Sequence, residues 1–215
     1  MSEKLKEMSV AAFVDLTASD APAPGGGSVS ALFGSLSAAL TGMVAGLTVG
    51  KKKYVEVEAE MREVAAAAEA LKNELVEEID RDSDSFNEFM AAMALPKNTD
   101  EEKAARKAAM QNGLKSAAKV PCHVAETAAR IFPLAKTVVE RGNTNAVTDG
   151  LVAAMAARTA VIGAGLNVKI NLASIEDEDF VAEYSARVAA LEEQAIAAER
   201  EIFALSELTD RKSVV

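Results

Sequence analysis

The sequence has no tryptophan, one cysteine, one histidine and only 4% aromatic residues among its 215 positions. A single cysteine excludes a disulfide within the chain and is typical of a reducing cytosol, so we expect a cytoplasmic protein. One cysteine and one histidine are too few for an ordinary zinc site, so we expect no metal. A long basic run is also missing, and the net charge is −10. This balance argues against nucleic acid as a partner.

Sustained alternation of apolar and polar residues, the pattern of a β-strand, does not occur. Apolar residues recur instead at steps of three and four, as they do from Val57 to Ile79 and on to Met93. Alanine and other good helix formers supply much of the chain. Neither an internal repeat nor a dividing linker is visible. The sequence therefore predicts an all-α fold, a single helical bundle formed by one domain over residues 1–215.

Capping residues and prolines place the expected helix ends. Thr99 and Glu102 have the spacing of a capping box, which predicts a helix start. We expect this helix to end near residue 120, Pro121 to begin another, and Pro133 to kink that one. The expected helices cover approximately residues 9–19, 29–50, 54–96, 99–120, 121–141, 148–165 and 175–210.

The central stretch Val29–Val49 carries no charge. Its small residues recur every four positions, at Ser30, Gly34, Ala38, Gly42 and Gly46. One face of a helix would then be lined by small side chains that let another backbone or a flat ligand approach closely. We expect this Gly/Ala/Ser-rich helix to be surrounded on all sides, partly by a second subunit in a homodimer. The alternative is a monomer that wraps its own central helix.

The same stretch is long enough to cross a bilayer. Its Ala, Gly, Ser and Thr content, and the charges and prolines ahead of it, favour a buried helix over a membrane span or a signal peptide. We therefore expect no membrane association.

Gly25, Gly26, Gly27 and Ser28 precede this apolar run. A helix that begins there presents free N–H groups, which can bind an anion or a carbonyl oxygen. A nucleotide P-loop is a poor match, because no strand precedes the glycines and the Gly-Lys-Ser/Thr spacing is missing. At the other end of the helix, Lys51–Lys53 form either a solvated terminus or a grip for an anionic tail.

Asp82 interrupts an apolar register, since it fills the position between Ile79 and Phe86. A carboxylate is costly to bury unless it is paired or used. The alternative is a frayed, solvated turn that contains Asp80, Asp82 and Asp84. By register we expect Asp82 to point inward and the other two aspartates to be solvated.

Three further residues could carry chemistry. Asp149 falls in the first turn of an expected helix, where by itself it would only stabilise the helix dipole. His123 has no serine or cysteine nucleophile signature around it, which disfavours a catalytic role. Cys122 is most simply a small core residue.

Five strings together resemble the cyclodeaminase/cyclohydrolase family of folate one-carbon enzymes. They are PAPGGGSVSAL, TVGKKKY, DSDSFNEFMAAMALP, GNTNAVTDGLVAA and GLNVKINL, and they extend over almost the whole chain. The resemblance implies an all-helical, metal-free dimer with its sites near the subunit interface. It also places Asp82 and Asp149 at the family's aspartates, which we take as the catalytic candidates. Ala146 and Thr148 stand where the family often has serine.

The family acts on tetrahydrofolate derivatives, and the resemblance implies such a substrate, possibly polyglutamylated, with no cofactor. An acidic protein then has a use for cations that hold an anionic glutamate tail. The substrate-binding candidates are Gly25, Gly26, Gly27, Ser28, Lys51, Lys52, Lys53, Arg141, Asn143 and Asn145.

The resemblance leaves two activities. A cyclohydrolase adds water to the carbon of 5,10-methenyltetrahydrofolate, whereas a cyclodeaminase forms that carbon bridge by releasing ammonia from the formimino compound. We favour methenyltetrahydrofolate cyclohydrolase, because no formiminotransferase domain accompanies the sequence. The alternative of another class is a non-catalytic helical scaffold whose glycine face is a dimer seam, although an inward Asp82 has no use in a scaffold.

Overall fold

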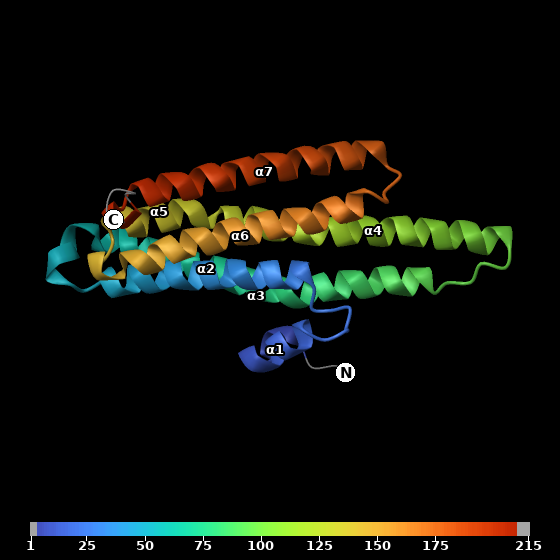
Figure 1. Cartoon of the computed structure of the whole chain (residues 1–215), viewed down its shortest axis with the longest axis horizontal. Coiled ribbons are helices and arrows are strands. Elements are labelled where there is room, and N and C mark those ends of the chain that lie inside the picture. Colours follow the sequence, from blue (N-terminus) through green and yellow to red (C-terminus); the bar gives the residue numbers. More distant parts are fainter. Residues whose placement is uncertain (1–3, 210–215) are drawn as a thin grey trace, which may run out of the picture.

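The computed structural model describes residues 4–209, and all the regular structure in that range is helical (Figure 1). In chain order the α-helices are α1 (Val10–Thr17), α2 (Gly26–Thr48), α3 (Glu58–Met93), α4 (Asp100–Ala129), α5 (Ile131–Arg141), α6 (Val147–Leu172) and α7 (Glu178–Ala204). Short 3₁₀ turns cover Leu5–Glu7, Lys52–Val57, Thr144–Ala146 and Glu207–Thr209. The predicted all-α bundle is confirmed.

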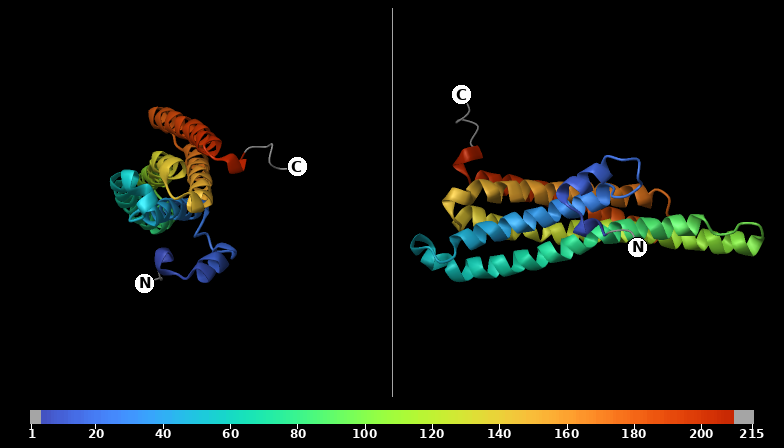
Figure 2. Two further views of the ribbon diagram at one scale, coloured as in Figure 1. Left: turned by 90° about the vertical axis from the view of Figure 1, so that its left-hand side faces the viewer. Right: turned by 90° about the horizontal axis from the view of Figure 1, so that it is seen from below.

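The helices form an elongated bundle in which α2 packs between α3 and α6 (Figures 1 and 2). Helix α4 packs on α3 and α6, and α7 covers α6 from outside. The α3–α4 hairpin extends beyond the other helices at one end, and α1 stands apart from the bundle (Figure 2). The start of α2 lies beside the C-terminal half of the long α3 helix, where Ser28 contacts Asp82.

Two helix starts follow the capping signals. The Ser9 hydroxyl accepts the Ala12 N–H at 3.2 Å at the start of α1. Thr99 and Glu102 make the predicted capping box at the start of α4, where each side chain accepts the other's backbone N–H. Such caps satisfy N–H groups that have no acceptor within the helix.

The expectation that Pro121 begins a helix was wrong. Helix α4 continues through Pro121 to Ala129, and the break falls at Arg130. Because Pro121 has no N–H, the Ala117 carbonyl four residues earlier has no helical donor. Its oxygen instead accepts the Asn171 Nδ2–H of α6 at 3.0 Å. The expected kink at Pro133 was also wrong, since Pro133 lies in the first turn of α5, where no N–H is needed.

The last two helices have different ends from those expected. Helix α6 passes Gly165 and ends at Leu172, and α7 ends at Ala204. The expected end near Asp210 falls outside the described residues. Gly165 therefore lies inside α6 and does not end it. The absence of a side chain there suits the close packing of α7, because a Cβ would lie 2.8 Å from Glu192 Oε1.

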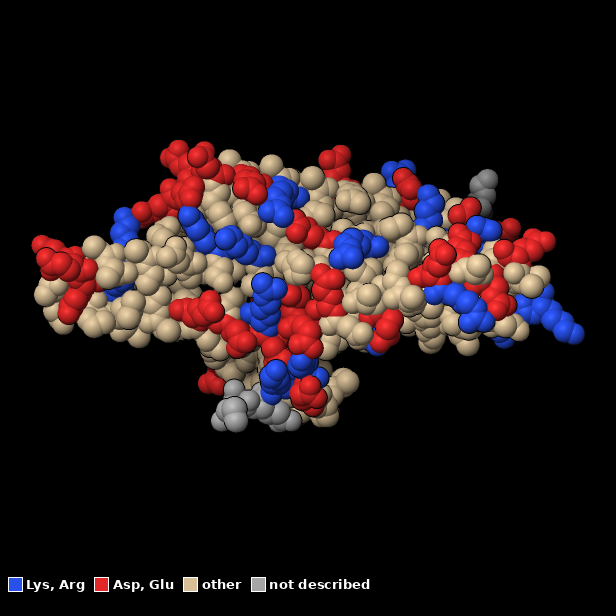
Figure 3. All heavy atoms as spheres, turned by 180° about the vertical axis from the view of Figure 1, so that it is seen from behind, with Lys and Arg blue, Asp and Glu red and all other residues tan. Residues whose placement is uncertain are grey.

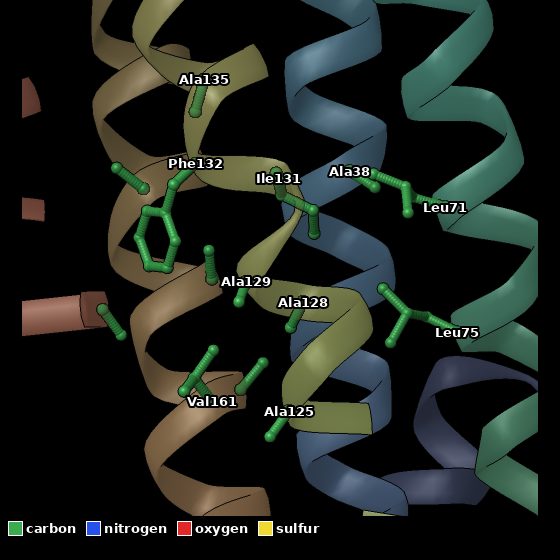
Figure 4. Close-up of a cluster of buried hydrophobic side chains, with 14 of the residues drawn as sticks. Ala38, Leu71, Leu75, Ala125, Ala128, Ala129, Ile131, Phe132, Ala135 and Val161 are labelled. Atoms are coloured by element: carbon green, nitrogen blue, oxygen red, sulfur yellow. The ribbon is translucent and has the colours of Figure 1, made fainter. Parts of the chain in front are cut away.

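The main core cluster combines many alanines, which let the helices approach closely, with Leu, Ile, Val and Phe side chains (Figure 4). The small face of α2 contributes to this packing. A Cβ on Gly34 would lie 3.1 Å from Leu75 of α3, and one on Gly42 would lie 3.5 Å from Ala68. At Gly46 nothing lies within 4 Å, so the face turns away from the core towards the end of α2.

Within one chain α2 is not surrounded on all sides, which contradicts the alternative of a monomer that wraps its own central helix. The expected cover by a second subunit stays a prediction. Large apolar side chains of α2 and α6 are exposed in a single chain. The two helices lie side by side on the side of the bundle that faces the viewer in Figure 1. This outer face consists of Phe33, Leu36, Met43, Leu47, Val152, Met155, Leu166 and Ile170. The opposite side carries many interspersed acidic and basic side chains (Figure 3).

Two helical segments, Gly26–Thr48 and Thr144–Leu172, are long and apolar enough to cross a membrane by length and composition alone. Half of each apolar window is buried inside the bundle. The buried side of α2 also carries hydroxyl groups, and the Ser37 hydroxyl donates to the Ala153 carbonyl of α6 at 2.7 Å. This polar contact joins the two apolar helices to each other.

Candidate active site

A pocket of about 340 Å³ lies at the N-terminus of α2. Four helices contribute to its wall. The residues on which the site depends are Gly25, Gly26, Gly27, Asp82, Phe86, Asn167 and Asn171. The pocket therefore combines the glycine triplet with the aspartate that interrupts the apolar register of α3.

Asp82 points inward and is held by the first turn of α2. Its Oδ2 accepts the Ser28 N–H at 2.8 Å and lies 3.0 Å from the Ser28 hydroxyl. That hydroxyl is also within hydrogen-bond distance of the Ile79 carbonyl, at 2.9 Å. The carboxylate thus occupies the positive end of the helix dipole, where a negative charge is stabilised.

Burial raises the pKa of Asp82 above its usual value, although its hydrogen bonds to Ser28 partly oppose this shift. The negative charge of Glu78 raises the pKa further. A carboxyl group with such a pKa accepts and returns a proton more readily near neutral pH than an exposed aspartate does.

The glycines are required because side chains pack directly against the start of α2. A Cβ on Gly27 would lie 2.0 Å from Asp82 Oδ1, and one on Gly26 would lie 2.9 Å from Asn167 Nδ2. Neither position can take a side chain unless these groups move. The N–H groups of this first turn have no acceptor within the helix.

Asn167 and Asn171 are pocket residues that the sequence analysis missed. They are one helical turn apart on α6, and the Asn167 Nδ2–H donates to the Gly163 carbonyl at 2.9 Å. Two amides spaced by four residues in the apolar segment Gly165–Leu172 were the signal that could have identified them.

Asp80 is not solvated, contrary to expectation. Its Oδ1 accepts the Leu5 N–H at 2.7 Å, and its Oδ2 is buried without a hydrogen-bond partner in the described part of the chain. The carboxylate ties the N-terminal segment to α3. Asp84 is exposed, as predicted.

A second group of candidate residues lies at the other end of α2. Lys51–Lys53 are exposed, and the Lys53 Nζ is 3.5 Å from the Thr144 hydroxyl and 5.1 Å from the centre of the Tyr54 ring. The Tyr54 hydroxyl oxygen accepts the Thr144 N–H at 3.0 Å. Hydrogen bonding to the Thr144 side chain, and then to its backbone, lowers the pKa of Tyr54 to about 8. The sequence analysis missed Tyr54, although it ends the TVGKKKY string.

The remaining candidates of this second group are partly committed to the fold. The Asn143 Nδ2–H donates to the Leu47 carbonyl at 3.1 Å, and its Oδ1 accepts the Asn145 N–H at 3.1 Å. Arg141 pairs with Glu60 at 2.6 Å. Asp149 lies in the first turn of α6, where its negative charge interacts favourably with the helix dipole.

Helix α2 separates the two groups within one chain. Its 23 residues extend about 34 Å at 1.5 Å per residue. Asp82 lies beside the first turn of α2, whereas Lys51–Lys53 follow its last turn. A single chain therefore does not bring Asp82 together with Asp149 and the lysines.

The two residues for which catalysis was disfavoured lie on α4. Cys122 is 1% exposed, and burial is the main cause that raises the pKa of its thiol to about 11, which suits a core residue. His123 is partly exposed, and its Nε2 lies 3.1 Å from Glu74 Oε1.

Known proteins resemble this chain in sequence and in fold. Residues 9–190 match the family described as formiminotransferase-cyclodeaminase. A methenyltetrahydrofolate cyclohydrolase of Methylorubrum extorquens is 44% identical over 171 residues, which cover 80% of this chain and 82% of the relative. A formimidoyltransferase-cyclodeaminase of Gallus gallus is 41% identical over 86% of this chain, but this chain covers only 34% of that protein. The crystal structure of a formiminotetrahydrofolate cyclodeaminase from Thermotoga maritima superimposes with a TM-score of 0.83 at 30% identity, over 94% of this chain and 97% of the other.

Proposed function

Because the chain belongs to the formiminotransferase-cyclodeaminase family, we propose that it is a cytoplasmic enzyme of folate one-carbon metabolism, a methenyltetrahydrofolate cyclohydrolase. The observation that carries the proposal is the inward Asp82 carboxylate, held by Ser28 in a pocket that the glycine triplet keeps open. The Methylorubrum extorquens relative, which is 44% identical and covered over 82% of its own length, carries this activity in its name. A scaffold protein would gain nothing from a carboxylate in this position.

The reaction requires a proton acceptor beside the methenyl carbon. Water attacks that carbon, its proton passes to Asp82, and the cation becomes a neutral hydroxy adduct. The bond from the carbon to N5 then breaks, N5 takes the electron pair and the proton from Asp82, and the hydroxyl proton leaves to solvent as the formyl C=O forms. One proton is released per turnover, and Asp82 returns to its ionised form.

The pocket suits both the charge and the oxygen of this reaction. The ionised Asp82 offsets the positive charge of the methenyl group. The free N–H groups at the start of α2 provide donors for the oxygen that water adds. The one-carbon unit is carried by the folate itself, so the proposed reaction uses no cofactor and no metal.

Formimidoyltetrahydrofolate cyclodeaminase is the second candidate. The Thermotoga maritima relative carries this activity in its name, and the same pocket would serve because the same carbon reacts. The absorbance of 5,10-methenyltetrahydrofolate separates the two activities. It falls when a cyclohydrolase consumes this compound, and it rises when a cyclodeaminase forms it from the formimino compound.

The proposed enzyme is a homodimer that pairs through the outer face. Covering these side chains would bury large apolar groups that one chain leaves exposed. In a two-fold pair with antiparallel α2 helices, the start of α2 in one copy meets the end of α2 in the other. Asp82 of one copy would then approach Lys51–Lys53, Asn145 and Asp149 of the second copy, which joins the two groups of candidates.

In that arrangement Lys51–Lys53 hold the anionic glutamate tail of the folate. The three side chains are exposed and follow directly on α2. A substrate with several glutamates would gain the most from them.

Substitution of Asp82 by asparagine tests the proposal. Asp82→Asn preserves the shape of the side chain but removes proton transfer, so we expect turnover of 5,10-methenyltetrahydrofolate to fall about 10²–10⁴-fold. Asp84→Asn is the matched control, because Asp84 is exposed on the same helix. If Asp82→Asn retains nearly full turnover, Asp82 is not the proton acceptor. If the wild-type protein acts on neither folate compound, the enzyme proposal fails as a whole.

A further inference from the structure

Glu78 is a buried carboxylate that the proposed reaction does not use. It is 4% exposed and lies one helical turn before Asp82 on α3. Its Oε1 accepts the Arg81 Nη1–H at 2.9 Å, but its Oε2 is buried and has no hydrogen-bond partner in the part of the chain that the structure describes. A buried carboxylate with one unpaired oxygen reduces the stability of the fold.

The charged groups around Glu78 come from α3 and α4. On α3 they are Arg81, Asp82 and Glu74, and on α4 the nearest is His123, whose Nε2 lies 3.7 Å from Glu78 Oε1. Glu74 also receives a hydrogen bond from the Thr127 hydroxyl and pairs with Arg130. The Arg81 guanidinium and the His123 imidazole lie on the exposed side of Glu78, since the Arg81 side chain is 61% exposed and that of His123 is 41% exposed. Asp82, one helical turn further along α3, is the carboxylate that lines the pocket.

We propose that Glu78 is a positioning residue whose negative charge makes Asp82 a stronger proton acceptor for the folate reaction. This inference rests on the proposed function, because it takes Asp82 as the group that receives the proton. Side chains four residues apart on a helix lie about 5–6 Å from each other. At that separation a like charge disfavours the ionised form of Asp82, and burial weakens the screening by solvent.

The proposed reaction explains why this adjustment matters. Asp82 must take a proton from water and give it to N5 in every turnover. An exposed aspartate is a weak base that would hardly accept the proton. Glu78 strengthens that base without touching the substrate, and the Arg81 guanidinium, which pairs with Glu78, limits the effect.

The test is the acid limb of the pH profile of kcat/KM for 5,10-methenyltetrahydrofolate. In Glu78→Gln the limb should move to lower pH, because Asp82 ionises more easily without the neighbouring charge. At a fixed pH on the limb, the activity relative to the plateau should rise by about threefold or more, from the Coulomb energy of two charges about 6 Å apart. The plateau itself should fall, because a weaker base accepts the proton less well.

Three variants serve as controls. Glu78→Asp keeps the charge and should keep the limb near that of the wild type. Glu77→Gln removes the same charge from the next residue, which is exposed and paired with Lys6, and should not move the limb. In the His123→Gln background, adding Glu78→Gln should still move the acid limb to lower pH. This result would show that the limb does not arise from titration of the His123 imidazole.

An unmoved limb in a folded Glu78→Gln enzyme overturns the inference. An equal shift in Glu77→Gln also overturns it, because net charge alone would then explain the result. If Glu78→Gln does not fold, Arg81→Gln replaces it. Loss of that cation should move the limb to higher pH, and no movement overturns the inference. Full activity of Asp82→Asn would instead refute the proposed function, so the two failures are distinguishable.

Discussion

A methyl group added at Gly27 should disable the site with little damage to the fold. In Gly27→Ala the new Cβ would stand 2.0 Å from Asp82 Oδ1 and 2.4 Å from its Cγ. Ordinary contacts between such atoms begin at 3.4 Å, so the carboxylate must move by more than about 1 Å. That movement breaks the 2.8 Å hydrogen bond from the Ser28 N–H.

Misplacement of a reacting group by about 1 Å can reduce the rate about 10²-fold. We therefore expect kcat of Gly27→Ala to fall at least about 10²-fold, measured by the absorbance of 5,10-methenyltetrahydrofolate. The overpacking should cost about 1–3 kcal/mol of unfolding free energy, which urea denaturation would measure.

Gly46→Ala is the matched control on the same helix. Nothing in the same chain lies within 4 Å of a Cβ at that position. The added methyl group does not displace Asp82 there, so activity should fall far less than in Gly27→Ala. Stability should rise by about 0.5–1 kcal/mol, because alanine is a better helix former than glycine. Near wild-type turnover in Gly27→Ala would refute the reasoning, because catalysis would then not depend on where the Asp82 carboxylate sits.

Three further outcomes follow from the same structure. Gly34→Leu should destabilise the fold by about 1–3 kcal/mol or more through its contact with Leu75, and by more than Gly42→Leu; equal melting temperatures of the two variants would contradict this. Replacement of Lys51–Lys53 by glutamine should raise KM more for polyglutamylated than for monoglutamylated folate at nearly constant kcat. Equal increases in KM for the two substrates would mean that the three lysines only form a solvated helix end. The pKa of Asp82 is raised in the folded state, so that state binds more protons than the unfolded chain does, and the contribution of this group to stability falls as pH rises above about 4. The melting temperature of Asp82→Asn minus that of the wild type should therefore increase between about pH 4 and neutrality. A difference that stays constant over this range would contradict the raised pKa.

The sequence was most informative where the direction of a side chain or the start of a helix depends on residues close together in the chain. The register of α3 predicted the inward Asp82, and the Thr99 capping box fixed the start of α4, because both signals are local. Asp80 was misplaced because its partner, the Leu5 N–H, is 75 residues away in sequence. A contact of that kind leaves no periodicity to detect.

The site was only partly predictable for the same reason. The glycine triplet was recognised, but its structural cause is the packing of Asp82 and Asn167 against it, and those residues come from two other helices. Which large side chains of α2 stay exposed in one chain was not predicted, because an apolar run does not reveal which of its faces the same chain covers.

Pro121 links the architecture of α4 to the chemistry of the pocket. In an uninterrupted α-helix each interior carbonyl oxygen already accepts an N–H of the same helix, so a donor from a neighbouring helix has to share it. The proline releases one backbone oxygen, that of Ala117, and Asn171 uses it as an anchor. The amide that lines the pocket is therefore oriented by the backbone of another helix, which no rotamer change of a neighbouring side chain can withdraw. A substitution of Pro121 that strengthens α4 would for this reason loosen Asn171, and local helix stability and pocket order would change in opposite directions.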